Sequence, residues 1–436
     1  MMTLSKAEFV DALKKGKGRA LQHLRVHGDA GLEDALLNAS IHCLAYDPQS
    51  EGDRGGWMME MLSFCRDPET YYRAVLAHFP ESDDGHDIAQ MAAMLVILAQ
   101  RGYPGARDLL YAKLDRQYLG GSDTAGQHIV HFDGQDIVDL DGIDGFLHVA
   151  EVIGRRMQSD ADFRADDYLL TAAGEKHGAD NVAAALQRAA KTNSNVSAYV
   201  DAIMAQSGSL IPKAKANAAP TRERISLAAF LDAPLDAKSK RRSMRWQFAR
   251  QATADELTSL LQLIAEETDS TRLHHYLGVF NKVDMPELSP PILELARSDD
   301  GETRDLAISA LARLTDDRVR SLAVELLDQG VLKAIELFAK NYVDGDFDRI
   351  AAKLGAPDDD RQIHDIGLDL LGVCRDHPVP ASAECLIWIY EHTPCAFCRN
   401  SAVDDLLAID RLPAALALEC QQDCYSDTRE AVAKAS

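Results

Sequence analysis

The chain has 436 residues, of which 46% are hydrophobic and 6% aromatic, with Ala and Leu dominating the apolar positions. The hydrophobic content excludes global disorder. The length suggests either two or three lobes or one elongated array. The formal net charge of −23 repels phosphates and makes nucleic acid an unlikely partner overall.

Export and membrane signals are not expected. Residues 1–18 carry Glu8 and Asp11 and lack the continuous apolar core of a signal peptide. No stretch approaches the ~18 uninterrupted apolar residues of a membrane span. The eight cysteines are too sparse for a disulfide scaffold, so we expect reduced thiols and a cytoplasmic protein with no membrane association.

Residues 1–207 are predicted to form a helical N-terminal lobe. Apolar side chains recur at three- and four-residue spacing over 31–45, 87–100 and 145–157, which is typical of amphipathic helices. Within the lobe, 118–144 is predicted to be a long loop because it is rich in Gly-Gly and Asp-Gly steps.

A two-stranded hairpin is predicted inside that loop. Residues 129–132 would pair with 137–140 across a turn at 133–136. The aspartates of the segment do not follow the ligand spacing of an EF-hand, so ordinary turn chemistry is the preferred interpretation.

A polar corner near the N-terminus has two interpretations. His42, Asp47, Glu51, Arg54 and Trp57 place an imidazole, two carboxylates and a guanidinium close together in sequence, as an enzyme site would. The favoured interpretation is a hydrogen-bonded corner, in which Pro48 ends a helix and Arg54 bridges to Asp47 or Glu51.

The middle of the chain contains a predicted linker and a basic run. Residues 208–221 combine Gly, Pro and small polar residues, which is typical of linkers. Residues 210–250 hold ten Lys or Arg and three acids, a local charge of +7 in an acidic protein. The run 238–250 is therefore a candidate surface for an anionic partner or for local nucleic-acid binding, although a helix that neutralises acidic neighbours is favoured. Its candidate binding residues are Lys238, Lys240, Arg241, Arg242, Arg245 and Trp246.

Helix pairs are predicted to repeat along 222–436. Both members of the pair recur every 28 to 35 residues or so, within the range of stacked helical repeats. The first helices are expected to start near Leu288, Asp316, Gly345, Pro380 and Leu412, and the second near Glu302, Val331, Asp360, Cys395 and Ser426.

One stretch carries a family resemblance. Asp300, Arg304, Ala307, Ala310 and Leu311 are spaced as in the HEAT/armadillo-like class of repeat proteins, which the chain resembles most clearly over 288–436. The resemblance implies an all-α fold, an α-solenoid of HEAT-like helix pairs that follows the N-terminal lobe. It also implies a role in scaffolding or partner binding.

The cysteine pattern near the C-terminus allows three interpretations. Cys395, Cys398, Cys420 and Cys424 have spacings that would suit a tetrahedral zinc site, and the first pair lies at a helix start, where thiols become reactive. Cysteines three residues apart also share one buried helix face, so packing without metal is preferred.

Familiar catalytic motifs are missing from the sequence, which has no GxxxxGK[ST], GxSxG or HExxH. We therefore expect a non-enzymatic binding or scaffold protein without a cofactor, whose partner is another protein. The alternative is an enzyme with its site around His42, Asp47, Glu51 and Arg54.

Overall fold

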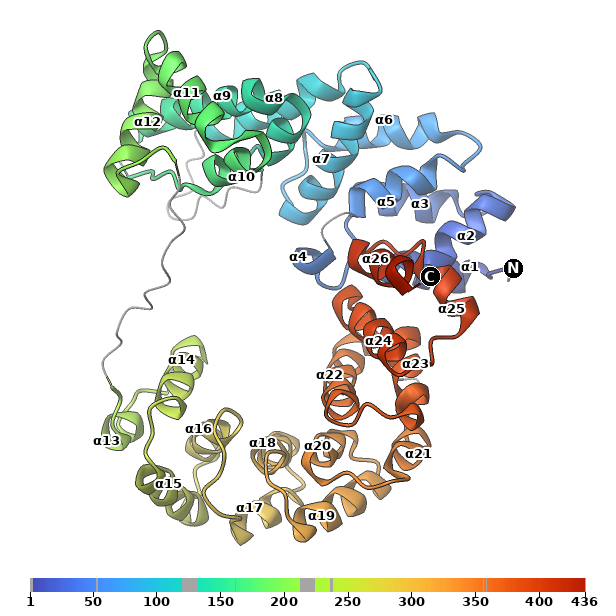
Figure 1. The fold of residues 1–436 in the computed structure, drawn as a ribbon, viewed down its shortest axis with the longest axis vertical. Coiled ribbons are helices and arrows are strands. Elements are labelled where there is room, and N and C mark those ends of the chain that lie inside the picture. The colour runs from blue at the N-terminus through green and yellow to red at the C-terminus, as the bar shows by residue number, and fades with distance from the viewer. Residues whose placement is uncertain are drawn as a thin grey trace. The chain divides into compact units, whose positions relative to one another are not determined.

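The computed structural model describes residues 3–51, 54–119, 132–160, 162–211, 224–235, 238–355, 357 and 359–435, without the side chains of 50 and 238–241. These residues form helices and connecting segments with no strand, which confirms the all-α prediction (Figure 1). None of their helices combines the length and the apolar character needed to cross a membrane.

The chain divides into two compact units. The first consists of Met1–Ala218 together with Gln422–Ser426, and the second of Ala219–Gln421 together with Asp427–Ser436. Most of the predicted linker, from 212 to 221, lies outside the described residues.

Helices make up the described part of the first unit. They are α1 (Lys6–Lys15), α2 (Gly18–His27), α3 (Glu33–Ile41), α4 (Pro48–Glu51), α5 (Arg54–Leu62), α6 (Pro68–His78), α7 (Gly85–Gln100), α8 (Ala106–Leu119), α9 (Gln135–Ser159), α10 (Tyr168–His177), α11 (Ala179–Ala190) and α12 (Ser194–Ser207).

Helix α9 is the centre of much of this unit, because α7, α8, α10, α11 and α12 all pack against it. Its contact with α12 depends on Gly154. A Cβ atom there would lie 1.8 Å from the carbonyl oxygen of Asn195, so only glycine permits this approach.

The predicted hairpin is wrong in its second strand. Residues 137–140 belong to α9, and residues 129–131 lie outside the described part of the chain. The Asp-Gly step begins a helix instead of turning a hairpin. Gly134 has φ 94°, and the carboxylate of Asp133 accepts a hydrogen bond from the Gln135 N–H at 2.9 Å. The buried side chains of Ile137 and Val138 then join the helical core.

The second unit is also helical where it is described. Its elements are α13 (Leu227–Leu231), α14 (Lys238–Ala249), α15 (Ala254–Glu266), α16 (Ser270–Phe280), α17 (Pro290–Leu295), α18 (Gly301–Leu311), α19 (Asp317–Asp328), the 3-10 helix η1 (Leu332–Leu337), α20 (Phe338–Asn341), α21 (Asp346–Ala351), α22 (Asp360–Asp376), the 3-10 helix η2 (Pro380–Ser382), α23 (Ala383–His392), α24 (Ala396–Ala408), α25 (Ala414–Cys420) and α26 (Ser426–Ala435).

Each helix start predicted for the repeats lies within two residues of an observed one. Side-chain capping marks three of these starts, those of α18, α19 and α22. The side chain of Asp300 accepts a hydrogen bond from the Thr303 N–H at 3.0 Å and so begins α18. Of the apolar positions Ala307, Ala310, Leu311 and Leu314, the first three are buried and Leu314 is half-buried.

The helices of the second unit pack in neighbouring rows. In one row α16 contacts α18, α18 contacts η1, η1 contacts α22, and α22 contacts α24 (Figure 1). The second row packs alongside, with α15 on α16, α17 on α18, α19 on η1 and α23 on α24. Most contacts therefore join elements that are close in sequence.

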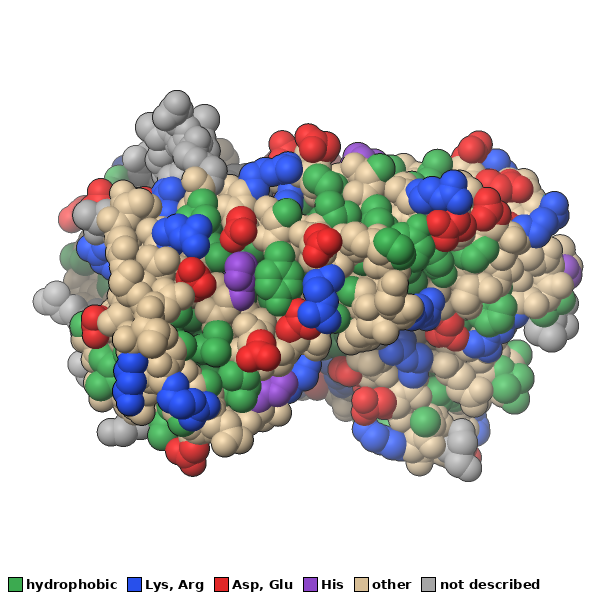
Figure 2. All heavy atoms as spheres, turned by 90° about the horizontal axis from the view of Figure 1, so that it is seen from above, with side chains coloured by type: hydrophobic (Ala, Val, Ile, Leu, Met, Phe, Trp, Pro, Cys, Tyr) green, Lys and Arg blue, Asp and Glu red, His purple; other side chains and the backbone are tan. Residues whose placement is uncertain are grey.

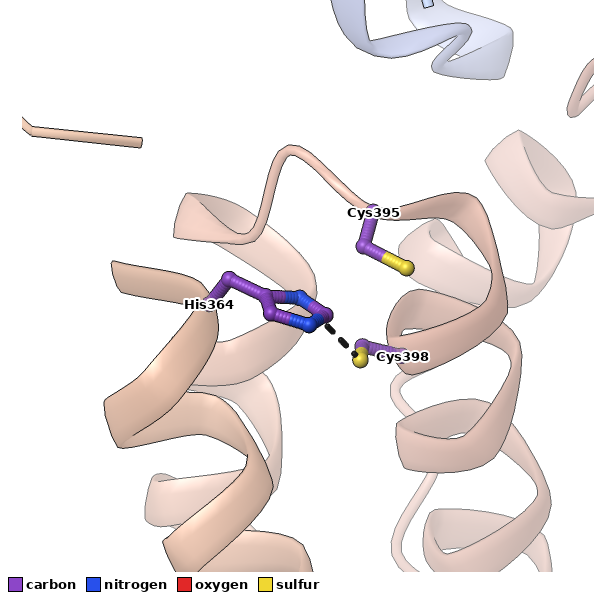
Figure 3. Close-up of side chains that lie close together, drawn as sticks. All are labelled: His364, Cys395 and Cys398. Atoms are coloured by element: carbon purple, nitrogen blue, oxygen red, sulfur yellow. Dashed lines mark hydrogen bonds between the residues drawn. The ribbon is translucent and has the colours of Figure 1, made fainter. Parts of the chain in front are cut away.

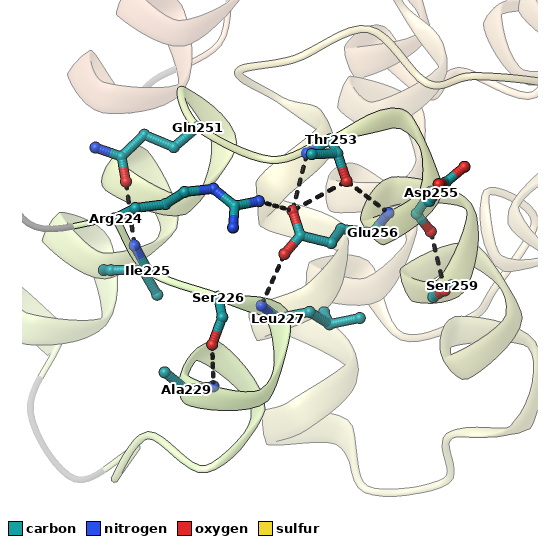
Figure 4. A network of polar contacts seen from close by, with 10 residues as sticks. All are labelled: Arg224, Ile225, Ser226, Leu227, Ala229, Gln251, Thr253, Asp255, Glu256 and Ser259. Carbon is teal, nitrogen blue, oxygen red and sulfur yellow. Dashed lines mark hydrogen bonds and ion pairs between the residues drawn. The ribbon is translucent and has the colours of Figure 1, made fainter.

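The carboxylate of Glu256 connects neighbouring segments at the start of the second unit (Figure 4). Glu256 closes a capping box with Thr253 at the start of α15. It also accepts hydrogen bonds from the side chain of Arg224 at 2.7 Å and from the Leu227 N–H at 3.2 Å. These contacts fasten the segment that leads into α13 onto α15.

Candidate functional site

A hollow of the second unit lies on the row that contains α18, η1 and α22. It is a groove of about 800 Å³, within the range of ligand-binding sites. Arg304 and Asp305 come from α18, and the turn between α19 and η1 forms another wall. The groove therefore spans successive helix pairs and is not enclosed within one of them.

Charges of both signs line the groove. The cations are Arg304, Lys333 and Arg361, and the acids are Asp305, Asp359, Asp365 and Asp369. Leu368 adds an apolar side chain that is 47% exposed. Such a mixed lining suits a polypeptide better than it suits a polyanion.

The most constrained charges of the groove surround Lys333. Its Nζ lies 3.1 Å from both carboxylate oxygens of Asp369 and 2.8 Å from Glu336. Burial disfavours the ammonium charge, but Asp369 and Glu336 hold the pKa of Lys333 above its usual value. Burial raises the pKa of Asp369 to about 7 despite the attraction of Lys333, with Glu336 and Asp365 adding repulsion.

The polar corner of the first unit separates into two structural arrangements. His42, which follows α3, pairs through Nδ1 with a carboxylate oxygen of Asp87 at 2.8 Å. The other oxygen of Asp87 accepts the Cys43 N–H at 2.7 Å, so this α7 carboxylate fastens the end of α3. Asp47 is half-buried just before α4.

Glu51 and Arg54 form the second arrangement, a buried ion pair. Their side chains are only 1% and 6% exposed. The guanidinium also donates hydrogen bonds to the carbonyl oxygens of Leu13 and Lys14 at 2.6 and 2.7 Å, at the C-terminal end of α1. The prediction that Arg54 bridges to a nearby carboxylate is confirmed for Glu51.

The segment Gln422–Ser426 is held by the same corner. The Cys424 thiol donates to Glu51 at 3.7 Å, and its backbone N–H donates to the carbonyl oxygen of Gly16 at 2.9 Å. The indole N–H of Trp57 donates to the carbonyl oxygen of Gln422 at 3.0 Å. Glu51, Arg54 and Trp57 thus anchor this segment within the first unit.

A small cavity lies at this corner. The cavity beside Cys43, Glu51, Arg54, His86 and Gln90 has a volume of about 80 Å³, well below the ~300 Å³ at which ligand pockets usually begin. Because its buried charges are already engaged with one another, a structural role is the simpler interpretation.

The basic run forms α14, as far as the structure describes it. The side chains of Lys238, Lys240 and Arg241 lie outside the description. Arg242 is exposed, and Arg245 covers Gly278 of α16, where a Cβ would lie 2.2 Å from the guanidinium. Trp246 is 43% exposed and stacks under Arg250, whose guanidinium carbon lies 4.5 Å from the ring centre. An anion-binding role for 238–250 stays a prediction.

On the face of the molecule shown in Figure 2, basic and acidic side chains are interspersed. This alternation is typical of an ordinary solvated surface, in which neighbouring charges neutralise one another.

The four cysteines near the C-terminus do not form one cluster, as a four-cysteine zinc site would require. Cys395 and Cys398 meet His364 of α22, and the three ligand atoms all lie within 4.8 Å of one another (Figure 3). Cys420 is buried on α25, outside this cluster, and Cys424 belongs to the corner of the first unit. His364 is the partner that the cysteine spacing did not reveal.

The two thiols of the cluster differ in acidity. Cys395 precedes the first turn of α24, where the Cys398 thiol and the backbone N–H groups of Phe397 and Cys398 donate to it. These donors lower the pKa of Cys395 below that of an ordinary thiol. The same contact with Cys395, together with burial, raises the pKa of Cys398.

These observations define an all-helical protein with many packed helix pairs. No protein-family model matches the sequence, and no curated protein matches it either.

Proposed function

We propose that the chain is a non-enzymatic binding protein that holds a protein partner in the groove of its second unit. The observation that carries this proposal is the groove itself, a hollow of about 800 Å³ that spans α18, the α19–η1 turn and α22.

The arrangement of the second unit supports a HEAT-like α-solenoid as the framework. Its elements contact mainly their neighbours in sequence, and the row from α16 to α24 presents one side of successive pairs. Solenoids use such a row as an extended binding surface, because each pair adds side chains to the same face.

The chemistry of the groove specifies the kind of partner. Four acids against three cations, in a chain of net charge −23, disfavour a polyphosphate backbone. A protein segment with a basic or mixed surface complements these charges, and an apolar side chain of that segment would cover Leu368.

The decisive experiment changes the groove without disturbing its core. Leu368→Arg adds a charge at an exposed position of α22, and Leu418→Arg makes the same change at a 58% exposed position of α25, outside the groove. Tagged wild-type and variant chains are used as baits in native cell extract, and captured proteins are quantified by mass spectrometry.

We expect a protein that wild type and Leu418→Arg retain equally and that Leu368→Arg loses, with affinity reduced roughly 30-fold or more if Leu368 is a central contact. His42→Ala should keep the same partner. Equal capture by both arginine variants, or no specific capture by the wild type, would refute the assignment of the groove.

A further inference from the structure

We propose that His364, Cys395 and Cys398 bind a zinc ion that joins α22 to α24. Within the described part of the chain, this is the one group of three potential ligands that brings its donor atoms within 4.8 Å of one another. Figure 3 shows the Cys398 sulfur facing the imidazole ring of His364, with the Cys395 side chain beside it at the start of α24.

The distances fit a tetrahedral ion. With Zn–S bonds of about 2.3 Å and Zn–N bonds of about 2.0 Å, neighbouring ligand atoms lie roughly 3.5–3.8 Å apart. The Sγ of Cys398 already lies 3.6 Å from Nδ1 of His364. No other pair exceeds 4.8 Å, so side-chain adjustments of about 1 Å close the geometry.

The backbone holds these ligands in place. Thr393, fully buried, accepts the Cys395 N–H on its hydroxyl oxygen at 3.3 Å and so fixes the turn that enters α24. Cys398 lies three residues further on, hence on the same helix face, and α22 packs directly against α24 to supply His364.

The donor set selects the class of metal. Two sulfurs and an imidazole suit zinc, whereas calcium and magnesium require oxygen ligands. Charge balance agrees. The cysteines are 3% and 1% exposed, and two thiolates with a Zn²⁺ ion and a neutral imidazole carry no net charge.

The fourth ligand would come from solvent or from a bound molecule. His364 is only half-buried, and Phe397, between the two cysteines in sequence, is 53% exposed. The cluster therefore lies near the surface of the second unit, where an ion and a fourth donor can reach it.

The first test measures zinc in the full chain purified without chelators under reducing conditions. We expect one zinc per chain by elemental analysis, and its loss in Cys398→Ser. Removing a direct ligand should weaken affinity by more than the ~10–100-fold caused by losing an outer-shell partner. Cys385→Ser is the matched control, because Cys385 is equally buried on α23 but outside the cluster, and it should keep the ion.

The second test needs no variant that might misfold. Cobalt added to the metal-free wild-type chain should give tetrahedral ligand-field bands and thiolate-to-cobalt charge transfer, both abolished by competing zinc. A chain that is purified without zinc and shows no charge-transfer bands would overturn the proposal. A Cys395–Cys398 disulfide in the freshly purified chain, detected by intact mass, would also overturn it and assign the pair to thiol redox chemistry.

Discussion

Replacing Arg54 by methionine should destabilise the first unit strongly. The substitution keeps a long side chain but leaves the Glu51 carboxylate, 1% exposed, without its cation. Breaking a buried ion pair in this way costs about 3–5 kcal/mol, because the remaining charge stays desolvated. The carbonyl oxygens of Leu13 and Lys14 lose their donors as well.

The free energy of unfolding is measured by urea titration with Trp57 as the reporter. The chain has three tryptophans, and Trp57 is the one in the first unit. A background with Trp246→Phe and Trp388→Phe therefore restricts the fluorescence signal to the unit that contains Arg54. A lower urea midpoint at unchanged slope would report lost stability.

Two further variants test whether the buried Glu51–Arg54 ion pair accounts for the loss of stability. Arg73→Met removes an exposed partner of Glu69, with side chains 70% and 41% exposed, and should lower the stability far less than Arg54→Met does. Adding Glu51→Leu to Arg54→Met removes the unpaired charge and should recover part of the loss. The role of the buried Glu51–Arg54 ion pair is refuted if Arg54→Met lowers the free energy of unfolding no more than Arg73→Met does. It is also refuted if the double variant is less stable than Arg54→Met alone.

Three other predictions follow from single positions. Gly16→Ala should cost more than ~1 kcal/mol in the same assay, because φ is 70° and the new Cβ would lie 2.1 Å from the Cys424 sulfur. A Gly16→Ala variant as stable as the wild type would refute the expected steric conflict with Cys424. For Asp369, with a folded pKa of about 7 against about 4 unfolded, the folded state binds more protons between these values. Stability of the second unit should therefore fall as pH rises from about 4 to about 7, and Asp369→Asn should flatten this slope in urea titrations at several pH values. Leu311→Asp buries a charge at a fully buried position and should unfold the second unit by circular dichroism, whereas Leu368→Asp should not.

The repeat helices were predictable because their signals are local. Asp300 caps its helix through a residue three positions away, and the apolar spacing of α18 lies within one helix. The hairpin prediction was wrong because it, too, depended on a local signal. An Asp-Gly step is compatible with both a hairpin turn and a helix start, and only the burial of Ile137 and Val138 in the tertiary core separates the two.

The candidate sites were less predictable because they join distant segments. Cys424 lies 373 residues from Glu51, and no local pattern links them. His364 lies 34 residues before Cys398, and only the packing of α22 on α24 identifies it as the third member of the cluster. A CxxC spacing indicates where two ligands lie but carries no information about a third on another helix.

The same packing relates the groove to the cysteine cluster. Asp369 and His364 both belong to α22. Asp369 faces Lys333 in the groove, and His364 meets Cys398 in the cluster. A metal that joined α22 to α24 would restrict the movement of a helix that forms one wall of the groove. A partner that prefers one position of α22 would then bind more tightly to the zinc-loaded chain, and by linkage would itself strengthen zinc binding. Loss of zinc without any change in partner affinity would instead show that the cluster stabilises α22 and α24 alone.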